Sequence, residues 1–369
     1  MMADYYIFAA ITSGLIYLSI LTFLISGYFH LNGEEINHQP TVSVVVAARN
    51  EEKNLNNCLK ALFCQNYPKE LTQIVVVDDR SSDRTPEILN QHKSQNTNLE
   101  IVKILKTPEN ISSKKYALSQ GILQASGELI FTTDADCSPP PEWISATVPL
   151  FNEEVGLVIG LAPYKDEGPL LSKLLSLNSL TASFVSAGSA GWNVGVTCTG
   201  RNLAYRKSLF NEVNGFDKIN HSLSGDDDLF LQMAKKRTHW DINFCLNPKT
   251  VVPSPAAENL FTLIAQTRRH VSAGKYYKKP LQAAYLLFNF ANIYLFSFLI
   301  LAIFKQTYLI LAILLFCFKL ILDLISLFFI SKKVKKQNLL FLFPLWEIFY
   351  LLNQIFIAPL GFVGKIKWK

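Results

Sequence analysis

The sequence predicts an α/β domain with a mostly parallel sheet that helices cover on both faces, and it places transmembrane helices at both ends of the chain. Between residues 32 and 279, short apolar and β-branched runs alternate with amphipathic stretches, which is typical of strands buried on both faces and joined by right-handed crossovers. Apolar segments long enough to cross a bilayer as helices lie before and after this region.

Composition agrees with a membrane protein whose middle part is soluble. Of the 369 residues 50% are hydrophobic, the mean hydropathy is +0.21, and the net charge is +6. Many of the lysines flank the C-terminal apolar segments, where basic residues are typical of cytoplasmic flanks facing anionic lipid and not of a nucleic-acid surface. The six cysteines show no CxxC pairing, so we expect reduced thiols in a protein that faces the cytosol.

The first half of the middle region alternates strand and helix patterns. The run TVSVVVAA at 41–48 is a strand pattern, and the leucines of 54–65 recur on one helical face. Further strands are expected at 71–77 and 100–105, a helix at 85–95 with a proline in its first turn, and a helix at 112–125 that two serines open.

The second half of this region is less regular. Residues 169–187 form an apolar helix that could pack on the core or lie on the membrane surface, and we favour the surface. The remaining expectations are a strand at 155–161, a strand, glycine turn and return strand over 194–206, a strand at 242–252, and a basic, aromatic interfacial helix at 259–277.

We expect three domains: a transmembrane anchor at 1–31, a cytoplasmic α/β domain at 32–279, and a membrane domain of two to three helices at 280–369. Lys319 and Asp323 lie four residues apart in the second C-terminal span and can pair on one helix face. The last apolar segment, 339–362, contains two prolines and several polar residues. Either it is re-entrant or the positive-inside rule fails here, because a full crossing would put the lysines that end the chain outside.

The stretch ELIFTTDADC at 128–137 is the centre of the functional prediction. A short buried strand runs directly into Asp134 and Asp136, which share a face if the strand geometry holds. Two carboxylates this close repel unless a cation lies between them, and Mg²⁺ or Mn²⁺ takes oxygen ligands and often a substrate phosphate as well. A solvated turn is the alternative for this pattern alone. Asp79 also ends a strand, so one cleft at the carboxyl edge of the sheet could hold all three acids.

A second acidic cluster, Asp226, Asp227 and Asp228, precedes the apolar helix FLQMA. Acidic residues at a helix start suit the helix dipole. Three adjacent carboxylates exceed what capping requires, so the cluster is a further candidate for the site.

Six motifs, AARNEE, VVVDDRSSD, TTDADC, GRNLAYR, SGDDDL and QTRRH, fall in the order and spacing of inverting family 2 glycosyltransferases with a GT-A fold. The resemblance covers about residues 41–277. With its flanking apolar helices the chain resembles membrane-bound members, namely polysaccharide synthases of the cellulose, hyaluronan and poly-N-acetylglucosamine type, and ceramide glucosyltransferase.

The resemblance implies roles for individual residues. Asp134 and Asp136 would position the nucleotide-sugar and its metal, Mg²⁺ or Mn²⁺, and Asp227 would be the general base that takes the proton of the acceptor hydroxyl. Its pKa would be raised by Asp226 and Asp228. The donor-binding residues implied are Ala47, Arg49, Glu51, Asp79 (at the base or ribose, usually of uridine), Lys114, Asp134, Gln266 and Arg269, and the acceptor-site candidates are Asp226 and His270.

Some residues depart from the family pattern. His270 stands where the family has a Trp that stacks on the acceptor sugar, which argues against a processive enzyme; a surface histidine is the alternative. Arg49 and Arg80 replace an aromatic residue and a glycine, and Lys114 could instead be a solvated helix charge.

The resulting hypothesis is a multi-pass enzyme of the cell membrane, a bacterial inner membrane, with its catalytic domain in the cytoplasm. It would move a sugar from a nucleotide-sugar, a UDP-sugar in the usual case, to a lipid or glycan acceptor at the bilayer, with inversion and without a nucleic-acid partner. Two alternatives stay open: a processive polysaccharide synthase and an inactive nucleotide-sugar-binding scaffold.

Overall fold

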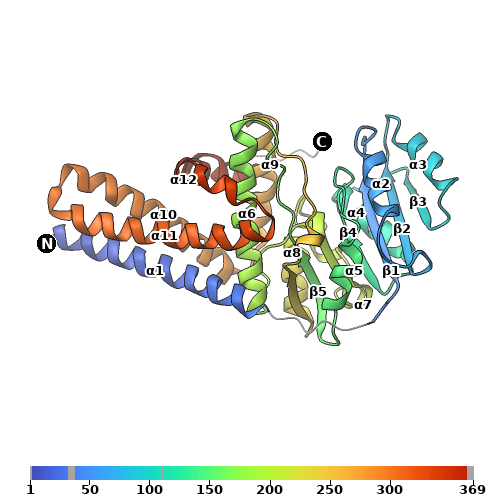
Figure 1. Ribbon diagram of the computed structural model, residues 1–369, viewed down its shortest axis with the longest axis horizontal. Helices are drawn as coiled ribbons and strands as arrows, with labels where there is room; N and C mark the ends of the chain where they lie inside the picture. The colour runs from blue at the N-terminus through green and yellow to red at the C-terminus, as the bar shows by residue number, and fades with distance from the viewer. Residues whose placement is uncertain (1, 32–37, 110, 364–369) are drawn as a thin grey trace.

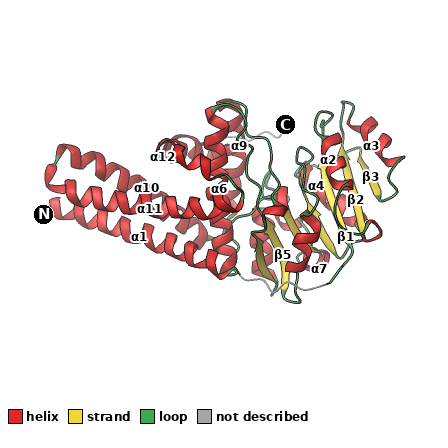
Figure 2. Cartoon of the chain, in the orientation of Figure 1, coloured by secondary structure: helices red, strands yellow, loops and turns green. Residues whose placement is uncertain are grey.

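A computed structural model describes residues 2–31, 38–109 and 111–363 and places one sheet beside a bundle of long helices (Figures 1 and 2). The seven strands lie in the order β3-β2-β1-β4-β6-β5-β7, and only β6 runs antiparallel to its neighbours. The mostly parallel sheet is therefore confirmed. The strands are β1 Val42–Ala48, β2 Thr72–Asp79, β3 Leu99–Ile104, β4 Leu129–Thr132, β5 Val155–Gly160, β6 Leu203–Arg206 and β7 Asp241–Cys245.

Helices cover both faces of this sheet. Along β1, Val44 packs in one core with Leu59 of α2, whereas the next residue, Val45, packs in another core with Leu118 of α4. This alternation is the physical reason why the β1 run is apolar without a break. The helices of this region are α2 Leu55–Phe63, α3 Thr85–Lys93, α4 Ser113–Gln124, α5 Trp143–Thr147, α6 Leu170–Gly191, α7 Lys207–Glu212, α8 Asp228–Arg237 and α9 Leu260–Ser272.

Two strand predictions are wrong in part. Residues 194–199 form no strand, because Thr197 and Cys198 hydrogen-bond instead to the carboxylate of Asp228. Strand β7 ends at Cys245, since Asn247 caps a short 3₁₀ turn that begins at Pro248, a residue with no N–H for a ladder.

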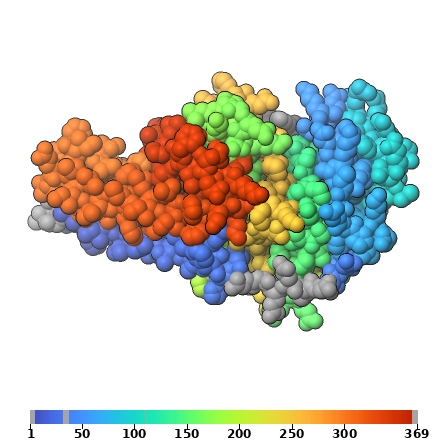
Figure 3. Space-filling model, viewed as in Figure 1, coloured from blue at the N-terminus to red at the C-terminus, as the bar shows by residue number. Residues whose placement is uncertain are grey.

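In the described part of the chain, four helical segments are long and apolar enough to cross a membrane: Tyr5–His30, Lys279–Phe304, Gln306–Lys333 and Gln337–Phe362. Within them lie α1 Met2–His30, α10 Lys279–Phe304, α11 Leu309–Lys333 and α12 Phe343–Leu352. Helices α1, α10 and α11 run side by side and extend away from the sheet, so the molecule is elongated (Figures 1 and 3).

Helix α6 joins the two parts of the molecule. Leu177, Leu180 and Phe184 are buried in the core that it shares with the sheet, so our preference for a helix that merely lies on the membrane surface is wrong. On its other side α6 crosses α1 at glycines: a Cβ on Gly27 would lie 1.9 Å from the carbonyl oxygen of Gly188, and a Cβ on Gly191 would lie 1.9 Å from the carbonyl oxygen of Gly27. Backbone therefore touches backbone at this crossing.

Candidate active site at the carboxyl edge of the sheet

Parallel strands bring the first set of predicted residues to one edge. Strands β1 and β2 pair with Ala47 opposite Val77, so Ala47 and Asp79 both lie near the carboxyl ends of adjacent strands. Strand β4 pairs with β1 on its other side and ends two residues before Asp134. The expected gathering of these residues at one edge follows from the sheet order.

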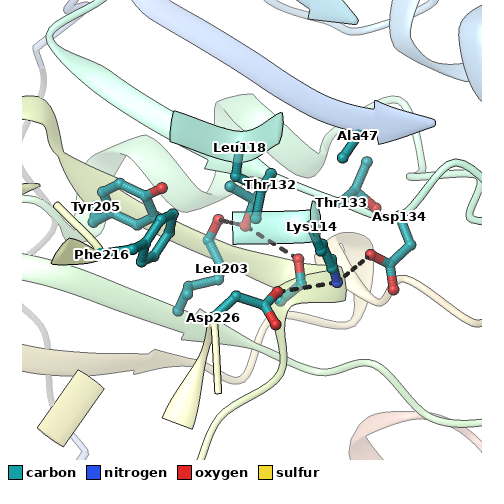
Figure 4. Close-up of a pocket in the computed structure, with 11 residues that line it drawn as sticks. Ala47, Lys114, Leu118, Thr132, Thr133, Asp134, Leu203, Tyr205, Phe216 and Asp226 are labelled. Atoms are coloured by element: carbon teal, nitrogen blue, oxygen red, sulfur yellow. Dashed lines mark hydrogen bonds and ion pairs between the residues drawn. The ribbon is translucent and has the colours of Figure 1, made fainter. Parts of the chain in front are cut away.

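The centre of the cleft is an ion-pair cluster around Lys114 of α4. Its Nζ lies 2.9 Å from Oδ1 of Asp134 and 3.0 Å from Oδ2 of Asp226, so one ammonium joins an acid that follows β4 to an acid that precedes α8 (Figure 4). Desolvation opposes the charged form, yet Asp134, Asp226 and Asp227 together raise the pKa of Lys114. Lys114 is thus no solvated helix charge, and Ala47 and Thr133 line the same small pocket.

The charge of Lys114 compensates only part of the repulsion between Asp136 and Asp134. Burial and the charge of Asp134 raise the pKa of Asp136. A divalent cation would relieve this repulsion, which is the observation that fits a metal here. Among the described residues, no group of three or more His, Cys, Asp or Glu is arranged to hold an ion. Two neighbouring carboxylates are the kind of ligand set that Mg²⁺ shares with a substrate phosphate.

Asp227 lies at the start of α8 beside this cluster. Its Oδ1 accepts a hydrogen bond of 2.8 Å from the N–H of Asp228, and its Oδ2 accepts one of 3.1 Å from the N–H of Gly200. These bonds fix the carboxylate plane. Desolvation, followed by the charges of Asp226 and Asp228, raises the pKa of Asp227 to about 7. That value suits a group that exchanges a proton near neutral pH.

Asp228 orients the loop that faces Asp227. Its Oδ1 accepts hydrogen bonds from the hydroxyl of Thr197 (2.9 Å) and the N–H of Cys198 (2.7 Å), and its Oδ2 accepts one of 2.6 Å from the hydroxyl of Tyr277. Sequence reasoning did not single out Tyr277. The sequence offered one indication: Tyr277 lies just before the first C-terminal span. A tyrosine at the membrane end of the domain can thus contact the acidic cluster.

Asp79 is paired before any ligand arrives. Its carboxylate accepts hydrogen bonds from Nε (2.8 Å) and Nη2 (3.3 Å) of Arg80, and Nη2 also donates to Ser113, the residue before Lys114. Arg80 adopts φ 58°, a backbone conformation that favours glycine. Glu51 lies in the loop after β1, where its Oε2 accepts a hydrogen bond from Asn54, and Arg49 is exposed just beyond the end of β1.

Helix α9 brings His270 within electrostatic reach of Lys114 and Asp226. Gln266 and Arg269 are half-buried on it, and the ring of His270 keeps solvent contact. Partial desolvation, with the cations of Arg269, Arg201 and Lys114, lowers the pKa of His270 to about 4, so the ring is neutral at pH 7. These neighbours place His270 within electrostatic reach of the cluster, in favour of a cleft residue over a plain surface histidine.

Arg201 is the second residue that sequence reasoning missed. It lies in the 3₁₀ turn Gly200–Asn202, where its guanidinium donates to Thr199 and Ser254 and stacks 4.6 Å above the ring of Tyr164. Its charge acts on Asp136 and on His270. Arg201 belongs to the motif GRNLAYR, but the motif alone does not show which acid the arginine lies near.

The mostly parallel sheet with helices on both faces is a GT-A fold. The same fold occurs in the solved mannosyltransferase from Pyrobaculum calidifontis in complex with GDP-Man and Mn²⁺, with a TM-score of 0.59 at 17% identity over 94% of this chain and 99% of that one. Residues 43–213 match the family model described as Glycosyl transferase family 2. Residues 43–213 therefore form a family 2 glycosyltransferase domain, in agreement with the resemblance inferred from the motifs.

Curated relatives agree with this assignment. The chain is 30% identical over 210 residues to the probable glycosyltransferase YdaM of Bacillus subtilis, and 33% identical over 192 residues to the glycosyltransferase AglE of Haloferax volcanii. These matches cover 56% and 51% of this chain, and 49% and 59% of the relatives, so the chain spans about half the length of either. It is also 33% identical, over 30% of its length and 23% of the relative, to a beta-monoglucosyldiacylglycerol synthase of Synechocystis.

Proposed function

We propose that this protein transfers a sugar, with inversion at the anomeric carbon, from a nucleoside-diphosphate sugar to a hydroxyl of a lipid or other membrane-associated acceptor. The catalytic domain lies in the cytoplasm beside the bilayer. The observation that carries the proposal is the cluster in which Lys114 joins Asp134 and Asp226 next to Asp227, at the edge of the sheet where ligands bind in α/β folds.

Asp227 is the general base of the proposed reaction. Its pKa near 7 lets an ionised carboxylate accept the proton of the acceptor hydroxyl as that oxygen attacks the anomeric carbon. The N–H groups of Gly200 and Asp228 hold both carboxylate oxygens in place, and Asp228 is itself held by Tyr277. One displacement by the acceptor gives a β-linked product from an α-linked donor.

The donor lies along the opposite side of the cleft. Asp79 and Arg80 face the nucleoside, and Lys114, Gln266 and Arg269 face the diphosphate, to which an arginine can donate bidentate hydrogen bonds. Asp134 and Asp136 would hold a divalent cation together with the diphosphate. When bound, such a cation neutralises the departing diphosphate.

A lipid acceptor is supported by the position of the cleft. Tyr277, which bonds Asp228, stands two residues before α10, so the base is close to the membrane end of the domain. Two of the relatives carry the names beta-monoglucosyldiacylglycerol synthase and dolichol-phosphate mannosyltransferase. A neutral His270 in place of a stacking indole favours a short transfer over the extension of a polymer.

The test is a transfer assay with the purified full-length protein in nanodiscs. Radiolabelled UDP-, GDP- and other nucleotide-sugars are offered with extracted membrane lipids, with Mn²⁺ or with EDTA, and products are separated by thin-layer chromatography. We expect one labelled glycolipid of defined size whose new linkage is β by NMR, formed only with the cation.

Two outcomes would contradict the proposal. A ladder of polymer lengths would favour a processive synthase, whereas nucleotide-sugar binding without any transfer or hydrolysis would favour a scaffold. Asp217→Asn, an exposed aspartate outside the cleft, serves as the matched control for substitutions of the cleft acids.

A further inference from the structure

The last apolar segment, residues 337–362, is held to the catalytic domain at both ends. At its start, Nζ of Lys336 lies 2.6 Å from Oδ1 of Asp166 and 3.2 Å from Oγ of Ser176 on α6. At its end, Arg268 of α9 donates to the carbonyl oxygens of Leu360 (3.2 Å) and Val363 (3.1 Å). A segment that crossed the bilayer would have its two ends on opposite sides, so these contacts speak against a crossing.

The middle of the segment supports the same path. A straight helix of this length would reach about 40 Å, more than the ~30 Å of a bilayer core. The chain instead breaks into a 3₁₀ start, α12, a π turn and a 3₁₀ end. Phe349 and Ile357 pack against the cluster formed by Leu175 of α6 and Leu263 of α9. In Figure 1 the segment lies beside α6 and α9, at the sheet end of the bundle.

A buried charged cluster links residues 337–362 to the helix bundle. Lys319 of α11 is 1% exposed and pairs with Asp323 at 2.9 Å and with Glu347 of α12, which is 3% exposed. Tyr17 of α1 donates a 2.6 Å hydrogen bond to Asp323. Lys319 precedes the end of α11 by about 20 Å at ~1.5 Å per residue, so α12 reaches well into the apolar layer before the chain returns.

The returning end sets the place of α9. A Cβ on Gly361 would lie 2.7 Å from Cβ of Val271 and 3.0 Å from the carbonyl oxygen of Arg268, so the segment touches the α9 backbone directly. Arg269 and His270 lie between the two contact residues Arg268 and Val271, and His270 is within electrostatic reach of Lys114 and Asp226.

We propose that residues 337–362 form a re-entrant element whose charged anchor, Lys319 with Glu347, positions the α9 wall of the donor site. Glu347, Lys319 and Arg268 are positioning residues, because they act on the diphosphate only through Gln266 and Arg269. This inference rests on the proposed function for its effect on the donor, whereas the path of the segment does not depend on any reaction.

The path is tested by labelling single cysteines with a membrane-impermeant maleimide. In the full chain with Cys64→Ser and Cys317→Ser, which remove the two exposed thiols, a cysteine is placed at Glu153 in the domain, at Gln306 at the far turn of the bundle, or at Phe362. Spheroplasts and inside-out vesicles are compared. We expect the cysteines at 362 and 153 to react from the same side and the one at 306 from the other; reaction of 362 together with 306 overturns the proposal.

Positioning is tested by donor affinity. Glu347→Gln and Arg268→Ala should raise the donor KM, or the Kd of UDP or GDP with Mn²⁺, by about tenfold, because a small displacement of α9 removes its contacts from the diphosphate. Arg268→Lys should keep part of the affinity, and the exchange Lys319→Glu with Glu347→Lys should restore most of it. Lys305→Met, on an exposed lysine at the far end of α10, is the control.

Unchanged nucleotide affinity in a folded Glu347→Gln protein would refute the positioning role. If the protein binds nucleotides but transfers no sugar, the proposed function fails. The cysteine labelling and the ratio of nucleotide Kd between variant and wild type still test the re-entrant path and the positioning of α9.

Discussion

The cleft and the membrane bundle each contain one lysine between two carboxylates, and the two clusters differ chiefly in exposure. Lys114 lies 2.9 and 3.0 Å from Asp134 and Asp226 with 22% of its side chain exposed. Lys319 pairs with Asp323 and Glu347 and has only 2% of its side chain exposed. The aromatic rings of Phe296 and Tyr17 lie next to its ammonium.

The same arrangement, a lysine between two carboxylates, can serve a binding site or a structural core, depending on how much solvent reaches it. Beside Lys114, Asp134 keeps 34% of its side chain exposed, and a third acid, Asp227, has a pKa raised to about 7. A ligand can therefore change the charge balance there. Around Lys319 the ions bind one another and the hydroxyl of Tyr17, so the cluster joins α1, α11 and α12.

Asp227→Asn should reduce transfer most, by about 10³-fold in kcat, because the amide cannot accept the acceptor's proton. Initial rates at saturating donor measure this. The control Asp217→Asn should keep the wild-type rate. An Asp227→Asn protein with near wild-type kcat would exclude this carboxylate as the base.

Lys114→Met should lower transfer at pH 7 roughly 100-fold, as expected when a preorganised charge contact is removed. The wild-type rate should rise with pH through about 7 as Asp227 ionises. Lys114 lowers the pKa of Asp227, so its removal raises that pKa and moves the acid limb of the kcat/KM profile to higher pH. An acid limb that stays in place would show that the two groups are not coupled.

Lys319→Met should chiefly destabilise the fold. It leaves two carboxylates buried in an apolar layer without their cation, a loss of roughly 3–5 kcal/mol for pairs of this kind. The triple change Lys319→Met, Asp323→Leu, Glu347→Met removes the charges together and should regain most of the melting temperature in detergent. Equal melting temperatures for the single variant and the wild type would contradict the structural reading of this cluster.

Tyr277→Phe should have the smallest effect, a fall of about fivefold in kcat. The change deletes one hydrogen bond to a charged acceptor, which contributes roughly 1.5–3 kcal/mol, while Thr197 and Cys198 still hold Asp228. The burial that raises the pKa of Tyr277 keeps it a neutral donor, so the loss should be the same at pH 7 and pH 9. A loss that varied with pH would assign Tyr277 a proton-transfer role instead.

The strand ends were predictable because they depend on local pattern. The β-branched run of β1, and the acids that follow β2 and β4, place Asp79 and Asp134 at one edge once parallel pairing is assumed. The contact between Lys114 and Asp226 was not predictable, since it joins residues 112 positions apart and depends on how α4 and α8 pack.

Hydrogen bonds between residues distant in sequence also changed a segment whose local pattern predicts a strand. Residues 194–199 read as a strand, but the carboxylate of Asp228 takes the hydrogen bonds of Thr197 and Cys198 that a ladder would have used. The likeness of the motifs predicts which acids matter. It could not show that Arg80 already occupies the carboxylate of Asp79, because that pairing depends on a left-handed backbone at a position where a glycine was expected.

The glycine crossing of α1 and α6 has a consequence for the substrate. Where Gly27 meets Gly188 and Gly191, backbone packs directly on backbone, so α6 and the sheet with which it shares a core are held close to α1. Under the proposed function, the cleft would then keep a fixed height above the bilayer. A lipid acceptor would have to bring its reactive hydroxyl to that height, and the length of its headgroup would select one lipid over another.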